Sequence, residues 1–389
     1  MRRYIQEFRD FFRKGDMVLL LLCLVTTAFG CLILASATNP LGNVRYLVIQ
    51  IGAAALGVLA FAIFSSIDID FFSEHRNALV IFNAVLLLML IPFGTDNGTG
   101  NRSWLDFPFL PVNIQPAEIC KITFVMILAS VMSSHQNKIS SVKSVLHMAL
   151  HLIILMGMNM VLSDDAGVSL IFVFIFIGMA ITGGVSLIWF LIAGGALVAA
   201  FPIVWNVIMD NYQRLRFEVL LNPELDALGT GPRYQTMRAM RSLTGGGLTG
   251  QGLFQGTRTQ TRGALVAQHT DFVFSAVGEE LGYVGCAIVL ILLFLIVFRC
   301  IQVGTRSQDY MRRLICFGTA AALTFQILVN VGMNLELVPV IGLTLPFISY
   351  GGSSLVTLFA MLGLVSGVHA RPAPTSHERY IRPPLKSYQ

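Results

Sequence analysis

The chain has 389 residues, of which 55% are hydrophobic and only 12% are charged. Soluble domains carry about 25% charged residues, so this composition excludes an ordinary soluble protein. The formal net charge of +5 does not indicate nucleic-acid binding, because the basic residues gather at the N-terminus, around residues 299–313 and in the C-terminal tail. Basic segments next to apolar runs are typical of the cytoplasmic parts of a membrane protein.

The chain begins with an amphipathic segment and continues with about ten apolar runs. Hydrophobic residues recur at helical spacing among arginines from Tyr4 to Phe12, which predicts a short helix on the inner membrane surface. Crossing about 30 Å of hydrocarbon takes about 20 apolar residues, and the backbone must pair within its own segment there, so each run is expected to be a helix. The expected spans are residues 17–37, 46–67, 77–94, 115–133, 146–163, 166–182, 185–205, 275–298, 312–335 and 345–369. The predicted fold class is an all-α integral membrane protein with about ten transmembrane helices.

The charge distribution predicts which side of the membrane each loop occupies. An even number of spans with a basic N-terminus places both termini in the cytoplasm. Residues 95–114 and a large loop at about 206–274, between helices 7 and 8, then lie outside the cytoplasm. We expect residues 1–370 to form a single polytopic membrane domain and residues 371–389, with four prolines, to form a disordered cytoplasmic tail.

The large external loop combines seven arginines with a glycine-rich run at residues 244–252. Glycines let backbone amides approach an anion, and arginines offer paired donors to phosphate, so an anionic ligand is one interpretation. A flexible connection is the other. The run matches neither the dinucleotide fingerprint nor the nucleotide P-loop, so no nucleotide is expected.

Three acidic residues lie where this loop meets the eighth span. Asp271 follows His269 and Thr270, and its carboxylate could either cap the helix that begins here or take a proton from a sugar hydroxyl as a general base. Glu279 and Glu280 lie about two turns further on, at membrane depth, where a carboxylate usually faces a cavity or a partner. Glu279 projects roughly toward the face of Asp271, so the two could share one site.

The fourth span carries Glu118 and Lys121 three residues apart on one helix face. An i,i+3 ion pair is one explanation, and a polar cavity for substrate is the other. Upstream, Trp104 is most simply an interfacial anchor. Asp164 and Asp165 occupy a tight external turn, where helix capping is the default role.

The last expected span begins with an unusual segment, residues 344–354, which contains Pro346 and the pair Gly351 and Gly352. These residues interrupt helical hydrogen bonding. At membrane depth such backbone is tolerated only where it is buried in protein or lines a cavity.

Three long stretches carry a resemblance to a known family: Tyr212 to Pro223, His269 to Gly282, and Leu345 to Ser354. In order and spacing they resemble the SEDS family (shape, elongation, division and sporulation), whose members include RodA, FtsW and SpoVE. The similarity runs from Asp16 to about His369.

The resemblance implies a peptidoglycan glycosyltransferase that polymerises lipid II at the outer face of the bacterial cytoplasmic membrane. Asp271 would be its general base, and Trp104, Glu118 and Lys121 match motif positions associated with activity. A cognate class B penicillin-binding protein would supply the transpeptidase, within the elongation or division machinery. A RodA-like role in cell elongation and rod shape is favoured. The alternatives are an FtsW-like or SpoVE-like division or sporulation polymerase, a lipid II flippase, and a non-catalytic scaffold for a penicillin-binding protein.

Polar residues around this base are expected to contact the substrate, and Lys121, Arg214 or Arg216 could bind the departing diphosphate by charge-assisted bonds. The expected substrate contacts are Trp104, Glu118, Lys121, Arg214, Arg216, His269, Glu279 and Glu280. No cofactor is certain and no metal motif is visible, although a divalent cation, Mg or Mn, could assist. Its candidate ligands would be Asp164, Asp165, Glu279 and Glu280.

The chain also departs from the family's usual pattern at a few positions. These are residues 265–268 before His269, residues 163–167 between the fifth and sixth spans, residues 238–240, and a small insertion near Pro232 and Arg233. The proposed base is unaffected, whereas the acceptor side of the site and the subgroup are open.

Overall fold

The computed structural model describes residues 14–96, 101–106 and 113–371. The expected surface helix from Tyr4 to Phe12 and the tail beyond Arg371 lie outside the described residues.

The expected helical membrane architecture is confirmed. Within the described residues, nine helices are long and apolar enough to span a membrane, and a tenth apolar helix, α9, has 17 residues. The membrane helices are α2 (Met17–Thr38), α3 (Arg45–Ser66), α5 and α6 (Arg76–Leu88 and Leu90–Phe93), α7 (Pro116–Ser134), α8 (Val142–Ser163), α9 (Ala166–Thr182), α10 (Leu187–Ile203), α13 (Val273–Arg306), α14 (Tyr310–Asn334) and α15 (Gly352–Ala370). Short elements join them: η1 (Asn39–Leu41), α4 (Ile69–Glu74), η2 (Gln136–Lys138), η3 (Val204–Ile208), and the strands β1 (Gly94–Thr95) and β2 (Trp104–Leu105), which pair antiparallel.

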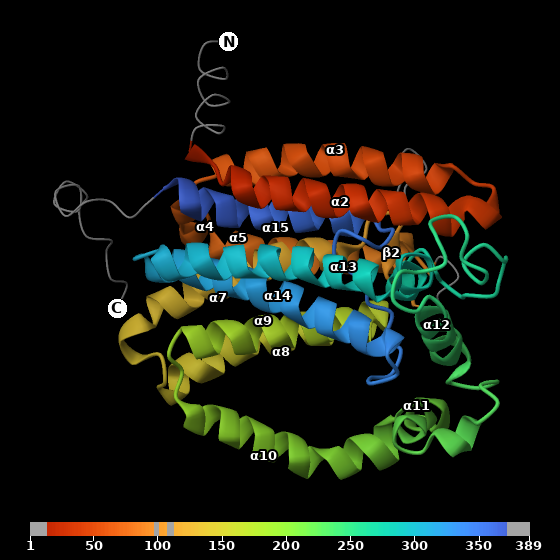
Figure 1. Ribbon diagram of the computed structural model, residues 1–389. Helices are drawn as coiled ribbons and strands as arrows, with labels where there is room; N and C mark the ends of the chain where they lie inside the picture. The colour runs from red at the N-terminus through yellow and green to blue at the C-terminus, as the bar shows by residue number, and fades with distance from the viewer. Residues whose placement is uncertain (1–13, 97–100, 107–112, 372–389) are drawn as a thin grey trace.

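The two ends of the described chain lie at the same end of the bundle (Figure 1). The backbone N–H of Asp16 donates to Ser366 Oγ, which joins the start of α2 to α15. Arg371 donates to the carbonyl oxygens of Ser66 and Ile67 at the end of α3. The opposite end carries the segment between α10 and α13, which includes α11 (Asn211–Leu221), η4 (Pro223–Asp226) and α12 (Tyr234–Gly245).

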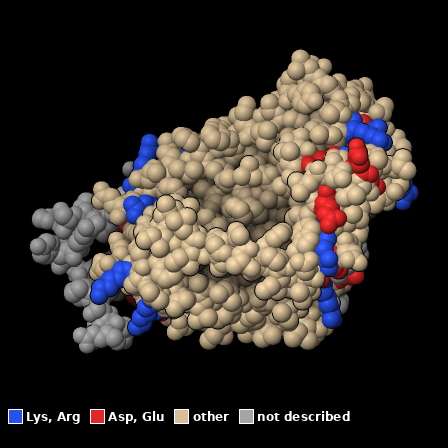
Figure 2. All heavy atoms as spheres, turned by 90° about the horizontal axis from the view of Figure 1, so that it is seen from below, with Lys and Arg blue, Asp and Glu red and all other residues tan. Residues whose placement is uncertain are grey.

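Helix α10 stands apart from the other membrane helices (Figure 1). Its N-terminal end is tied to the bundle, because Trp189 Nε1 donates to the carbonyl of Ser140. None of its residues is buried. Seen from below, charged atoms lie at the two ends of the molecule and the broad surface between them is uncharged and hollowed (Figure 2). Such a band matches a protein surrounded by hydrocarbon.

The last span begins later than residue 345, because α15 starts only at Gly352. Residues 345–349 are buried without forming a helix, and Phe347 has a φ of 65°. The side chain of Gln50 satisfies two groups of this backbone: Nε2 donates to the carbonyl of Ser349, and Oε1 accepts from the N–H of Gly351. The expectation that this irregular backbone is buried in protein is therefore confirmed.

Candidate active site

Asp271 lies in the segment that leads into α13, outside the membrane-spanning helix itself. The helix takes Phe272 as its N-cap residue and has no side-chain cap, so the capping interpretation of Asp271 is wrong. The carboxylate of Asp271 accepts no hydrogen bond from the part of the chain that the structure describes. An acidic group left without donors in this way is free to accept a proton from a ligand.

The surroundings of Asp271 favour its protonated form. Burial raises the pKa of Asp271 from 3.8 to about 6, and the negative charge of Asp165 adds to the rise. Burial also raises the pKa of Asp165, which lies in the turn between α8 and α9. A carboxyl whose pKa is shifted both by burial and by a neighbouring charge is a candidate for a functional site.

Asp165 is held by neighbours on both of its oxygens. Its Oδ1 accepts from the N–H of Val168, which makes it the N-cap of α9, as capping predicted. Its Oδ2 accepts from Gln115 Nε2 at 3.0 Å, just before α7 begins. The amide of Asn159 donates to its carbonyl oxygen. Asp165 is therefore fixed in place, whereas the carboxylate of Asp271 is not tied.

The start of α7 adds an ion pair to this cluster. Lys121 Nζ lies 2.7 Å from Glu118 Oε2, and Lys121 is 0% exposed, so the predicted i,i+3 pair is confirmed. Thr357 Oγ1 of α15 donates to the same glutamate oxygen at 3.0 Å. Glu118 and Lys121 both act electrostatically on Asp165. The structure thus gathers Glu118, Lys121, Asp165 and Asp271 at one end of the bundle.

Glu279 and Glu280 have different partners. Glu279 accepts hydrogen bonds from the N–H of Arg258 and from both the N–H and the hydroxyl of Thr259, at 2.8, 2.9 and 2.6 Å. Glu280 accepts from Ser36 Oγ at 2.6 Å and from Gln260 Nε2 at 2.9 Å. These carboxylates attach residues 257–260 to α13. The expected shared site with Asp271 is not formed by them, and their contact with substrate stays a prediction.

The glycine-rich run packs against a break in α13. The helix is interrupted at Gly282, whose φ is 67°, and the freed N–H groups of Tyr283 and Val284 donate to the carbonyls of Gly247 and Leu248. A Cβ on Gly282 would collide with this segment, and one on Gly250 would collide with the backbone of Glu280. The run is thus neither a free linker nor an open anion cradle. Gly246 and Gly250 of the run are needed for backbone contact with α13.

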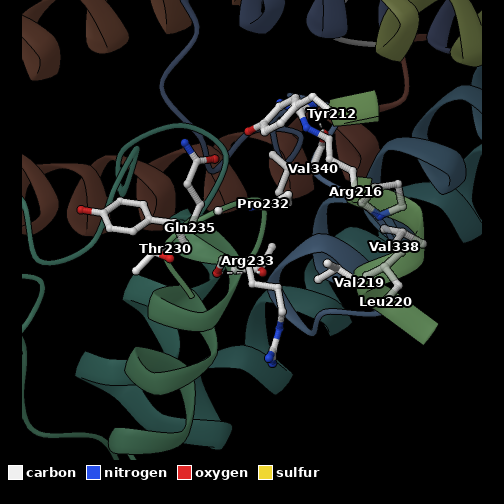
Figure 3. Close-up of a pocket in the computed structure, with 14 residues that line it drawn as sticks. Tyr212, Arg216, Val219, Leu220, Thr230, Pro232, Arg233, Gln235, Val338 and Val340 are labelled. Carbon is white, nitrogen blue, oxygen red and sulfur yellow. Dashed lines mark hydrogen bonds between the residues drawn. The ribbon is translucent and has the colours of Figure 1, made fainter. Parts of the chain in front are cut away.

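Arg216 of α11 lies in another part of the segment between α10 and α13 (Figure 3). Arg216 stacks over the Tyr212 ring at 4.7 Å and donates to the carbonyl of Val340. Both residues line a cavity of about 220 Å³ between α11, the start of α12 and residues 338–340. Arg214 donates twice to the carbonyl of Met209. No contact of the described residues joins either guanidinium to Asp271.

His269 and Trp104 complete the expected set. The ring of His269 lies 5.0 Å from that of Tyr46 and 6.1 Å from that of Tyr350, and burial lowers its pKa, which favours a neutral imidazole. Trp104 is half-buried in β2, opposite Thr95 of β1.

The four candidate metal ligands do not gather in one place. Asp164 is exposed in a left-handed conformation at the end of α8, Asp165 faces Gln115, and the two glutamates hold residues 257–260. Among the described residues no group of three or more His, Cys, Asp or Glu side chains is arranged to hold a metal ion. Assistance by a divalent cation therefore stays a prediction.

The residues that depart from the family's pattern have structural partners. Gln268 is buried and donates to the carbonyls of Ala37 and Thr259, at 2.6 and 3.0 Å. Arg238 stacks over Tyr234 and donates to the carbonyl of Gly263. Both residues therefore brace the segment between α10 and α13 and leave the carboxylate cluster intact.

The fold and the site define a polytopic helical membrane protein with two neighbouring carboxylates at one end of its bundle. A family model of cell cycle proteins, that of FtsW, RodA and SpoVE, matches residues 16–373. The chain belongs to this family.

Known proteins of the family are similar over most of the chain. Peptidoglycan glycosyltransferase MrdB of Escherichia coli is 33% identical over 356 residues, which cover 91% of this chain and 93% of that protein. The probable peptidoglycan glycosyltransferase FtsW of Thiomicrospira cyclica is 32% identical over 361 residues, 90% of each chain. Among solved structures, a chain of a peptidoglycan synthase complex matches with a TM-score of 0.76 and 28% identity, covering 91% of this chain and 97% of that one. The rod shape determining protein RodA of Thermus thermophilus matches with a TM-score of 0.66 and 26% identity, covering 93% and 98%.

Proposed function

We propose that this protein is a peptidoglycan glycosyltransferase that polymerises lipid II, with Asp271 as its general base. The observation that carries the proposal is the carboxylate of Asp271, which accepts no hydrogen bond from the described residues and feels the charge of Asp165. Relatives that are one third identical over nearly their whole length are named for this activity.

The reaction needs a base of the strength that the site provides. Asp271 takes the proton of the acceptor's sugar hydroxyl while that oxygen attacks the anomeric carbon of the donor. The bond from this carbon to the lipid diphosphate breaks, with inversion, and the diphosphate leaves with the electron pair. A carboxyl with a pKa near 6 is ionised at neutral pH and is a stronger base than an ordinary aspartate.

The leaving diphosphate needs positive charge nearby. Lys121 is the cation within the cluster, and Arg214 and Arg216 are the cations on α11. Where a divalent cation assists, Asp165 is the one of the four candidate ligands that lies in this cluster, and Mg²⁺ commonly binds to one or two carboxylates together with substrate phosphates. Such an ion would neutralise charge on the diphosphate.

The arrangement of charges supports the orientation of the protein. In Figure 2 the end nearer the chain termini shows basic side chains, and the opposite end shows both signs. We place the termini in the cytoplasm and α11, α12 and Asp271 outside. The uncharged hollow in the face that Figure 2 shows suits the apolar chain of a lipid-linked substrate.

The physiological role that we propose is RodA-like elongation, with a class B penicillin-binding protein as the partner. This rests on MrdB and on the similarity to a chain of a peptidoglycan synthase complex. A flippase or a scaffold remains the alternative that the following test addresses.

The test is polymerisation of purified lipid II by the detergent-solubilised protein, with and without its penicillin-binding protein. Glycan ladders from the wild type that vanish in Asp271→Asn support the proposal. Equal product from both proteins would show that Asp271 is not the base. No product from either protein, even with the partner present, would favour the flippase or scaffold.

A further inference from the structure

The segment that carries Asp271 is held by its backbone. The carbonyl of His269 accepts from the N–H of Tyr350 at 2.8 Å, and the carbonyl of Thr270 accepts from Ser349 Oγ at 2.6 Å. Both donors belong to the buried irregular segment before α15. His269 and Thr270, the two residues before Asp271, are thus fixed to a distant part of the chain. Ser349 lies 79 positions after Thr270.

The carbonyl of Asp271 is held by two asparagines of α14. Asn330 Nδ2 donates to it at 2.9 Å and Asn334 Nδ2 at 3.1 Å. Asn330 Nδ2 also donates to the carbonyl of Leu343 at 2.7 Å. Asn334 Oδ1 accepts from both the N–H and the hydroxyl of Ser275, at 3.0 and 2.6 Å. The side-chain amide of Asn334 therefore links Asp271, two residues before α13, to the first turn of that helix.

Both asparagines are 0% exposed, and they lie four residues apart on one face of the last turns of α14. Their burial excludes contact with a substrate in the surrounding solvent or lipid. Asn334 Oδ1 accepts from the N–H of Ser275 and so supplies what α13 lacks, because the helix's own N-cap residue makes no side-chain cap. A neighbouring helix caps α13 in place of a local residue.

We infer that Asn334, supported by Asn330, is a positioning residue that aims the carboxylate of Asp271. This inference rests on the proposed function. Because the carboxylate accepts no hydrogen bond from any residue that the structure describes, its direction depends on where the backbone of Asp271 is placed. The two amides fix that backbone against α14. A displacement of about 1 Å at a reacting group can lower the rate by about a hundredfold.

The test compares Asn334→Ala with Ser275→Ala. The asparagine variant removes the donor to Asp271 together with the acceptor for Ser275. The serine variant removes one hydrogen bond of the same amide and leaves the donor to Asp271 in place. Lipid II polymerisation, measured as kcat and KM per folded protein, is expected to show kcat at least about tenfold lower in Asn334→Ala, with KM little changed. Ser275→Ala is expected to keep most of the wild-type kcat.

Further variants keep the outcomes distinct. If Asn334→Ala does not fold, Asn330→Ala removes one donor to Asp271 and is expected to lower kcat in the same direction by less, since Asn334 still donates. Equal kcat in the asparagine and serine variants, with Asp271→Asn inactive, would overturn the positioning role and leave the proposed function intact. Full activity of Asp271→Asn would overturn both.

Discussion

The carboxylate of Asp271 should cost the protein stability at neutral pH, and Asp271→Asn should recover it. A carboxyl whose pKa is raised on folding is stabilised in its protonated form. Its favourable contribution to the free energy of unfolding is complete below the pKa of the unfolded state. That contribution is lost as the pH rises through the pKa of the folded state. For Asp271 these values are 3.8 and about 6.

The size of the effect follows from the difference between these two values. At about 1.4 kcal/mol for each pKa unit, it amounts to about 3 kcal/mol above pH 7 and roughly half of that at pH 5. This figure is an upper limit, because Asp271 is not completely enclosed and solvent screens part of the charge. Asparagine has nearly the same shape and carries no charge at any of these pH values.

Thermal unfolding in detergent at pH 5 and pH 7.5 measures the effect. The midpoint of Asp271→Asn is expected to exceed that of the wild type clearly at pH 7.5 and by less at pH 5. Asp164→Asn is the matched control, because it removes the same charge from an exposed neighbour of Asp165 in a left-handed conformation that asparagine tolerates. A gain that is the same at both pH values, or no larger than in the control, would refute the reasoning.

Three further predictions concern the neighbours of this carboxylate. Asp165→Asn should move the acid limb of the pH profile of kcat/KM to lower pH, because the charge of Asp165 helps to raise the pKa of Asp271; an unmoved limb would contradict this. Lys121→Met should lower the midpoint of thermal unfolding, because it leaves Glu118 buried without its cation at a cost of about 3–5 kcal/mol. The double variant Lys121→Met with Glu118→Gln should recover part of this loss. Gly282→Ala should destabilise the break in α13 by about 1–3 kcal/mol and make the glycine-rich run accessible to protease. Limited proteolysis measures this, and unchanged cleavage would mean that other contacts hold the run.

The membrane helices could be predicted closely from the sequence because each is a local apolar run of the required length. One exception arises where tertiary contacts replace local pairing. Helix α15 starts at Gly352, because residues 345–349 bond to Gln50 and to the segment before α13. Helix α13 continues to Arg306, eight residues past its expected end at 298, because a polar helical turn can extend beyond the apolar run.

The site was predictable only in part. Asp271, Glu118 and Lys121 stood out as acidic and basic residues near the membrane, where such groups are costly. Gln115, Asn330 and Asn334 gave no comparable signal, since one amide on an apolar helix has no characteristic spacing. Their partners lie tens of residues away, as the separations of 50, 59 and 63 show, so only the folded chain reveals them.

The arginines of the segment between α10 and α13 illustrate the same limit. Their number predicted an anionic ligand, yet Arg214, Arg216, Arg233 and Arg238 each donate to a main-chain carbonyl. A guanidinium carries five N–H donors, so one bond to the backbone leaves others for a diphosphate. The structural and the ligand-binding roles are therefore compatible within one side chain. Two measurements distinguish these roles. Removal of a structural arginine should loosen the segment between α10 and α13 in the absence of substrate. Removal of a ligand-binding arginine should leave that segment intact and raise KM for lipid II.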